Sequence, residues 1–108
     1  MISSAGRILQ RAARAAYDEG VLVNLGLSLL FLGAVAAERG DHALAARRLG
    51  AGERHFGMVI PAFIQSSVDV TIAQLTQSLA PERLDALLAD GASLSLDAAL
   101  ALAEAPPR

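Results

Sequence analysis

Residues 32–52 read LGAVAAERGDHALAARRLGAG, two stretches rich in Ala and Leu that a Gly-Asp pair separates. Ala and Leu lose little side-chain freedom in a helix, so each stretch favours an α-helix. Gly40 and Asp41 make a tight turn between the two helices, and Asp41 also suits the N-cap of the second helix. Gly33 and Ala45 are small residues on either side of this turn. The stretch therefore predicts an antiparallel helix pair in which Gly33 faces Ala45, so that the two helices approach closely.

The spacing within this stretch resembles the tetratricopeptide repeat, an antiparallel helix pair of about 34 residues. The resemblance covers about residues 26–59 and departs at Ala36, where a larger aromatic residue is usual, and at the repeat-ending Pro, unless Pro61 serves. A single repeat does not bury its own apolar face, so the resemblance implies stacked neighbours or a partner. It rests on Leu32, Gly33, Ala36, Gly40, Asp41, Ala45, Leu49 and Gly52.

Helical periodicity continues outward from this pair. The expected helices cover residues 4–19, 21–39, 42–56 and 62–79; a fifth begins at Pro81 and ends at Asp90-Gly91, and Ser95 caps a sixth. Residues 68–72 also alternate as a strand would, but a lone strand has no partner in this chain. The prediction is an all-α fold of tetratricopeptide-like antiparallel helix pairs with five or six helices. It forms a single helical domain over residues 1–108, with C-terminal helices at about 62–105, either as a whole protein or as a fragment of a larger one.

The charges argue against contact with nucleic acid. The net charge is −2, and the densest basic group, Arg7, Arg11 and Arg14, is followed at once by Asp18 and Glu19. An extended nucleic-acid surface needs clustered positive charge, so we interpret these arginines as a solvated helix face. The chain has no cysteine, and we expect a cytoplasmic protein.

One segment requires a membrane test, because residues 21–37 contain no charge. Seventeen residues are at the lower limit for a membrane span, and the run contains Asn24, Gly26 and Ser28. A helix buried on nearly all sides is the preferred interpretation. A membrane-associated helical protein using residues 21–37 remains an alternative.

The sequence offers no catalytic, cofactor or metal site. His42 and His55, the two histidines, are not arranged as HExxH, and packing or capping roles suit them better than metal binding. Ser66 and Ser67 precede Asp69 without a nucleophile elbow or a placed base. We therefore expect a protein that is not an enzyme and that needs no cofactor.

Residues 82–103 look like the closing segment of large bacterial transcriptional regulators, and residues 45–53 look like the preceding helix of that segment. These regulators are the ATPase-containing LuxR-type and cyclase-linked proteins common in actinobacteria. Leu84 and Leu88 depart from the pattern, because that family often has aromatic residues there. The resemblance implies a C-terminal, tetratricopeptide-like sensor or assembly arm. It carries over neither ATPase nor DNA-binding activity, because the chain contains no GxxxxGK[ST] loop and no recognisable helix-turn-helix.

These observations lead to a functional hypothesis of a non-catalytic protein-interaction or regulatory module, the C-terminal helical arm of a transcriptional regulator. A stand-alone helical dimerisation protein is the first alternative. The repeat places the following residues on the expected interaction surface: Leu27, Leu30, Ala34, Ala37 and Glu38. Leu25, Leu29 and Leu32 make the opposite face apolar as well, so something must cover this helix. The helix at 4–19 or the helices after Pro61 would do so; otherwise the cover is a neighbouring domain or a second copy, and we expect a homodimer.

Overall fold

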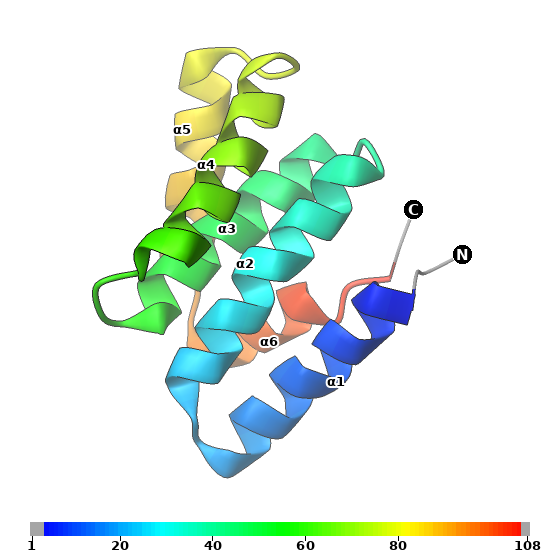
Figure 1. Ribbon diagram of the computed structural model, residues 1–108, viewed down its shortest axis with the longest axis vertical. Helices are drawn as coiled ribbons and strands as arrows, with labels where there is room; N and C mark the ends of the chain where they lie inside the picture. Colours follow the sequence, from blue (N-terminus) through cyan, green and yellow to red (C-terminus); the bar gives the residue numbers. More distant parts are fainter. Residues whose placement is uncertain (1–3, 107–108) are drawn as a thin grey trace.

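The computed structural model describes residues 4–106, and all regular structure within them is helical. This confirms the prediction of an all-α fold with five or six helices, and residues 68–72 are helical. Of the expected domain 1–108, residues 1–3 and 107–108 lie outside the described residues. Figure 1 shows the helices in chain order: α1 (Ser4–Glu19), α2 (Leu22–Glu38), α3 (His42–Phe56), α4 (Ala62–Thr76), α5 (Pro81–Ala92) and α6 (Leu96–Ala103).

Glycine turns and polar caps delimit these helices. Gly20 and Gly40 have φ angles of 74° and 80°, the left-handed region that glycine enters without a steric penalty. After Gly40, the Asp41 amide donates to the Ala36 carbonyl oxygen at 3.0 Å, so the α2 terminus is hydrogen-bonded as in a Schellman motif. The Asp41 side chain accepts from the Leu44 amide at 3.3 Å, and Ser95 accepts from the Ala98 amide at 3.2 Å. Both predicted N-caps are confirmed.

The predicted ends of three helices need correction. The second helix is Leu22–Glu38, one residue shorter at each end than the expected 21–39. The fourth ends at Thr76 and not at 79, and a turn then leads to Ala80, which Pro81 holds in extended backbone with ψ of 148°. The fifth continues through Gly91 to Ala92, where we expected an end at Asp90-Gly91. Gly91 lies inside the helix because it packs against another helix and does not cap its own.

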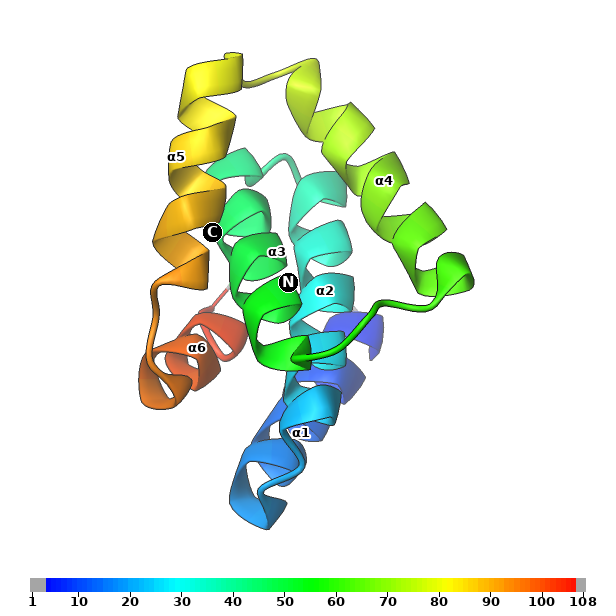
Figure 2. The same cartoon turned by 90° about the vertical axis from the view of Figure 1, so that its left-hand side faces the viewer.

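Helix α3 lies at the centre of the molecule, between α2 and α5, as Figure 2 shows. Glycines permit both contacts. A methyl group at Gly26 of α2 would lie 2.4 Å from the Phe56 amide nitrogen, and one at Gly50 of α3 would lie 2.0 Å from the Leu88 carbonyl oxygen of α5. These distances are far below van der Waals contact, so only hydrogen fits between the backbones.

The predicted pairing of Gly33 with Ala45 has the expected geometry. A methyl group at Gly33 would lie 3.2 Å from the Ala45 carbonyl oxygen and 3.0 Å from Leu49 Cδ2. Helices α2 and α3 are therefore an antiparallel pair in close contact, as the small residues predicted. Assignment of this pair to a tetratricopeptide array stays a prediction, because α5 and not the next helix in the chain, α4, makes the larger contact with α3.

The core has two parts, one on each side of the α2–α3 pair. Helices α4 and α5 bury one part, which contains Leu30, Leu49, Ile64, Val68, Leu75 and Leu87. Helices α1 and α6 bury the other, which contains Ala13, Leu25, Leu29, Leu32 and Leu100. In the part of the chain that the structure describes, no single helix is long and apolar enough to cross a membrane, although α5 and α6 together, bent by 119°, pass by length and composition.

Replacing Gly91 with Ala tests the α3–α5 contact. In an ordinary helix interior this substitution stabilises by about 1 kcal/mol. Here the new methyl group would lie 2.0 Å from the Arg47 carbonyl oxygen, so we expect a loss of about 1–3 kcal/mol in the free energy of unfolding, measured by urea titration. The control Ala86→Val adds more volume on the exposed side of the same helix and should cost about 0.5 kcal/mol. A Gly91→Ala protein at least as stable as wild type would contradict the close contact.

Candidate functional site

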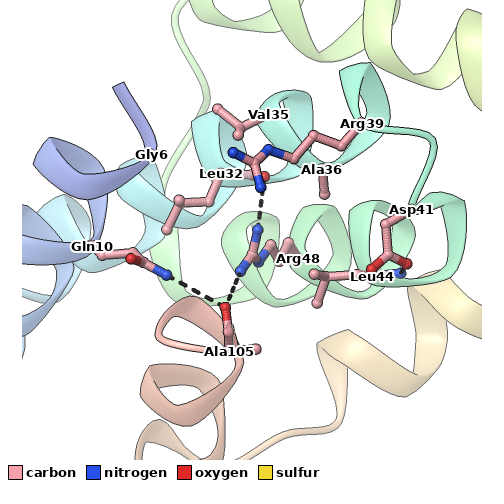
Figure 3. Close-up of a pocket in the computed structure, with 10 residues that line it drawn as sticks. All are labelled: Gly6, Gln10, Leu32, Val35, Ala36, Arg39, Asp41, Leu44, Arg48 and Ala105. Carbon is pink, nitrogen blue, oxygen red and sulfur yellow. Dashed lines mark hydrogen bonds between the residues drawn. The ribbon is translucent and has the colours of Figure 1, made fainter. Parts of the chain in front are cut away.

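A buried arginine occupies the space between α2, α3 and the end of α6. Arg48 is 4% exposed, and its guanidinium donates to main-chain carbonyl oxygens only. Nη1 reaches Leu32 at 3.2 Å and Nε reaches Leu102 at 3.2 Å, while Nη2 reaches Ala103 and Ala105, both at 3.4 Å. Figure 3 shows this side chain between α2 and the chain that follows α6, where Gln10 of α1 also donates to Ala105.

Burial on balance disfavours the charge of Arg48, and no carboxylate among the described residues is in contact with the guanidinium. Burial lowers the pKa of Arg48 to about 10, while the charge of Asp41 raises it and that of Arg39 lowers it, so the guanidinium stays protonated at pH 7. The C-terminal carbonyls of α6 carry partial negative charge that favours a cation. A cavity of about 50 Å³ adjoins this group, lined in part by Gln10, Leu32 and Leu44. Because the donors already bind carbonyl oxygens, the arrangement holds α6 in place, and it offers no reactive group.

The other residues considered for chemistry also have structural contacts. His55 Nε2 lies 3.1 Å from the Leu94 carbonyl oxygen, so that nitrogen donates to the segment before α6. Ser66 donates to the Ala62 carbonyl oxygen, and Asp69 accepts from Gln65 at 2.8 Å. His42 is half-buried at the start of α3. Within residues 4–106 no three His, Cys, Asp or Glu side chains lie close enough together to hold a metal ion.

An apolar groove runs between α1 and α2, and it is the better candidate for a functional surface. It consists of two hollows that share Leu9 and Phe31. Glu19 lies at one end and Glu38 at the other, and neither makes a hydrogen bond or ion pair within the described part of the chain. We call it the α1–α2 groove. Its apolar lining includes Ile8, Leu9, Ala12 and Ala15 of α1 and Leu27, Phe31, Ala34 and Val35 of α2, and the polar Asn24 and Ser28 of α2 line the hollow that contains Glu19.

The five residues predicted for the interaction surface lie in two different environments. Leu27, Ala34 and Glu38 line the α1–α2 groove. Leu30 is only 3% exposed, because α4 packs over it, and Ala37 packs against the same core. The expectation that Leu30 faces a partner is therefore corrected: the helices after Pro61 cover it. On the opposite side, α1 and α6 cover the following residues: Leu25, Leu29 and Leu32.

Sequence reasoning missed three residues that shape these sites. Arg48 was not considered, although its neighbours three positions away, Ala45 and Ala51, are fully buried. Ile8, which is 64% exposed, was not singled out either. Phe31 lines both hollows of the groove. Its position four residues after Leu27 and three residues before Ala34 was the available signal.

A second exposed apolar area lies on α4 and on the loop before it. Phe63 and Val70, two helical turns apart, are exposed on α4, and Met58 and Val59 are exposed in the loop. Figure 1 shows that α4 and α1 lie on either side of α2. One side of α4 therefore covers Leu30, and the side that carries Phe63 and Val70 is exposed to solvent.

Comparison of the chain with known protein families, with curated proteins and with solved structures found no match. The residues and geometry described above are therefore the basis for assigning a role.

Replacing Arg48 with Met tests the structural role of the buried guanidinium. Met has a similar length but removes the four charge-assisted hydrogen bonds that the guanidinium donates, so we expect a loss of about 2–4 kcal/mol in the free energy of unfolding. The neighbouring Arg47→Met is a matched control, because Arg47 makes an exposed ion pair with Asp90 at 3.1 Å. That change should cost less than about 1 kcal/mol. Equal losses in the two variants, measured by urea titration, would refute the role assigned to Arg48.

Proposed function

We propose that this chain is a non-catalytic protein-interaction module whose recognition surface is the α1–α2 groove, and that a second copy of the chain occupies that groove. The observation that carries the proposal is the exposure of Ile8 beside the half-buried Leu9 and Phe31. A folded monomer seldom leaves a continuous apolar area in water, so such an area marks an interaction site.

The hydrogen bonding of the interior supports a structural role for the polar groups. Every buried side-chain nitrogen and oxygen in the described part of the chain has a hydrogen-bond partner. Active sites are the places where ionisable groups are held in perturbed environments near a cleft. Here Arg48, whose pKa burial lowers, donates to four carbonyl oxygens and does not line the α1–α2 groove.

The setting that we propose is the helical arm of a transcriptional regulator in the cytoplasm. Its support is the resemblance of residues 82–103 to the closing segment of such regulators and the cysteine-free composition. In that setting the α1–α2 groove would bring two regulator chains together. A stand-alone dimerisation protein would use the same groove in the same way.

A charge placed in the groove tests the proposal. Ala34→Lys puts an ammonium among apolar side chains, with Glu38 one turn away to keep it compatible with the fold. Ala73→Lys is the matched control, because Ala73 is exposed on α4 and has Asp69 one turn away. By light scattering at 10–200 µM, we expect wild type and Ala73→Lys at twice the chain mass of 11.2 kDa and Ala34→Lys at the mass of one chain. A wild type that stays at one chain mass, or an Ala34→Lys protein that assembles like wild type, would contradict the proposal.

A further inference from the structure

Helix α1 carries a second stripe of residues on its exposed side. Ala5, Ile8, Ala12, Ala15 and Glu19 follow one another at intervals of three and four residues, the spacing of a coiled-coil seam. All five are exposed, while Ala13 and Ala16 on the other side of the helix are buried. Helix α1 therefore has one apolar face packed inside the molecule and another, made largely of alanine, in contact with solvent.

Two opposite charges flank the exposed stripe. Arg11 and Asp18 are seven residues apart, so they occupy the same position beside the seam in successive heptads. Arg11 makes no hydrogen bond or ion pair within the described residues. Asp18 has only a 3.7 Å contact with Arg14, whose guanidinium is held by Glu104 at 2.7 Å. Both flanking charges are thus able to bind an outside partner.

The order of charges along α1 identifies the direction of that partner. Arg7 and Arg11 lie towards the N-terminus, and Asp18 and Glu19 end the helix. This order opposes the helix dipole, which favours acidic residues at the N-terminus and basic residues at the C-terminus. An antiparallel copy of the same helix would set its acidic end against the basic half of α1, and its basic half against the acidic end.

We propose that two copies of this chain associate through an antiparallel pairing of their α1 helices about a two-fold axis. Ala12 of one copy lies opposite Ala15 of the other, and Arg11 of each copy binds Asp18 of the other. In this register Ile8 of the second copy lies opposite Glu19, at the end of the hollow that Ala15, Ala16 and Leu27 also line. The alanine seam lets the helices approach closely, and the two-fold axis repeats every contact. The inference rests on the proposed function and specifies its partner, register and ion pairs.

Exchange of the two charges tests the register. Arg11→Asp sets two acidic residues against each other at both ion pairs, and Asp18→Arg sets two basic residues against each other. We expect each variant to raise the dimer dissociation constant about tenfold, measured by analytical ultracentrifugation. The double variant Arg11→Asp/Asp18→Arg recreates both attractions with reversed signs, and its dissociation constant should return to within about threefold of wild type. Arg83→Asp, an equal charge change on exposed α5, should have no effect.

Mixing the two single variants gives the sharper result. In a mixed dimer, an Arg11→Asp chain and an Asp18→Arg chain oppose unlike charges at both ion pairs. We expect native mass spectrometry to show the mixed dimer well above the half share of random association. A random distribution, or a double variant as weak as the single variants, would overturn the antiparallel register.

The outcomes separate this inference from the proposed function. A dimer that Ala34→Lys dissociates, but that charge exchange does not affect, would retain the groove and reject the α1 pairing. A dimer that Ala34→Lys leaves intact, but that follows the charge exchange, would retain the α1 pairing and reject the groove as the recognition surface. A wild type that remains a single chain at 200 µM would reject both.

Discussion

The close contact of α3 with its two neighbours is the constraint on which the rest of the structure depends. Gly50 and Gly91 let the backbones of α3 and α5 approach until a single methyl group would lie 2.0 Å from a carbonyl oxygen. Gly26 and Gly52 play the same part between α3 and α2. Helices α2 and α5 thus occupy two sides of α3, and α4 and α6 contact its remaining faces. The two parts of the core lie under these covering helices.

The polar residues of α3 then hold the C-terminal part of the chain. Arg48 binds the carbonyl oxygens at the end of α6, Arg54 donates to the Ala92 carbonyl oxygen at 3.2 Å, and His55 lies against that of Leu94. Helix α6 in turn holds one edge of α1, through Arg14–Glu104 and a hydrogen bond from Tyr17 to Asp97. The opposite edge of α1 has no such cover, and this leaves the alanine stripe and the α1–α2 groove open to a second copy.

The sequence predicted the features that local chemistry controls. The helices, the caps at Asp41 and Ser95, and the contact of Gly33 with Ala45 follow from propensity, capping and residue size. It did not predict features that depend on which helices meet. Gly91 looked like a helix end because its contact is with α3, and Leu30 looked accessible because nothing local shows that α4 returns over it. Arg48 was missed because three of its four partners are carbonyl oxygens 54–57 residues away, which leave no trace in side-chain patterns. Part of the groove was predicted through Leu27, Ala34 and Glu38, but the α1 side of it was not.

Disulfide cross-linking tests the central claim, that the free edge of α1 is the seam between two copies, most directly. The chain has no cysteine, so single cysteines placed at Ala12 and at Ala15 report only on those positions. After the two variants are mixed and oxidised, the account predicts that the linked species contains mainly one chain of each kind, because position 12 of one copy lies opposite position 15 of the other within disulfide reach. Mass spectrometry without reductant identifies the species. A mixed species no more abundant than the half share of random linking, or linking no faster than that of an Ala89→Cys control on α5, would contradict the account.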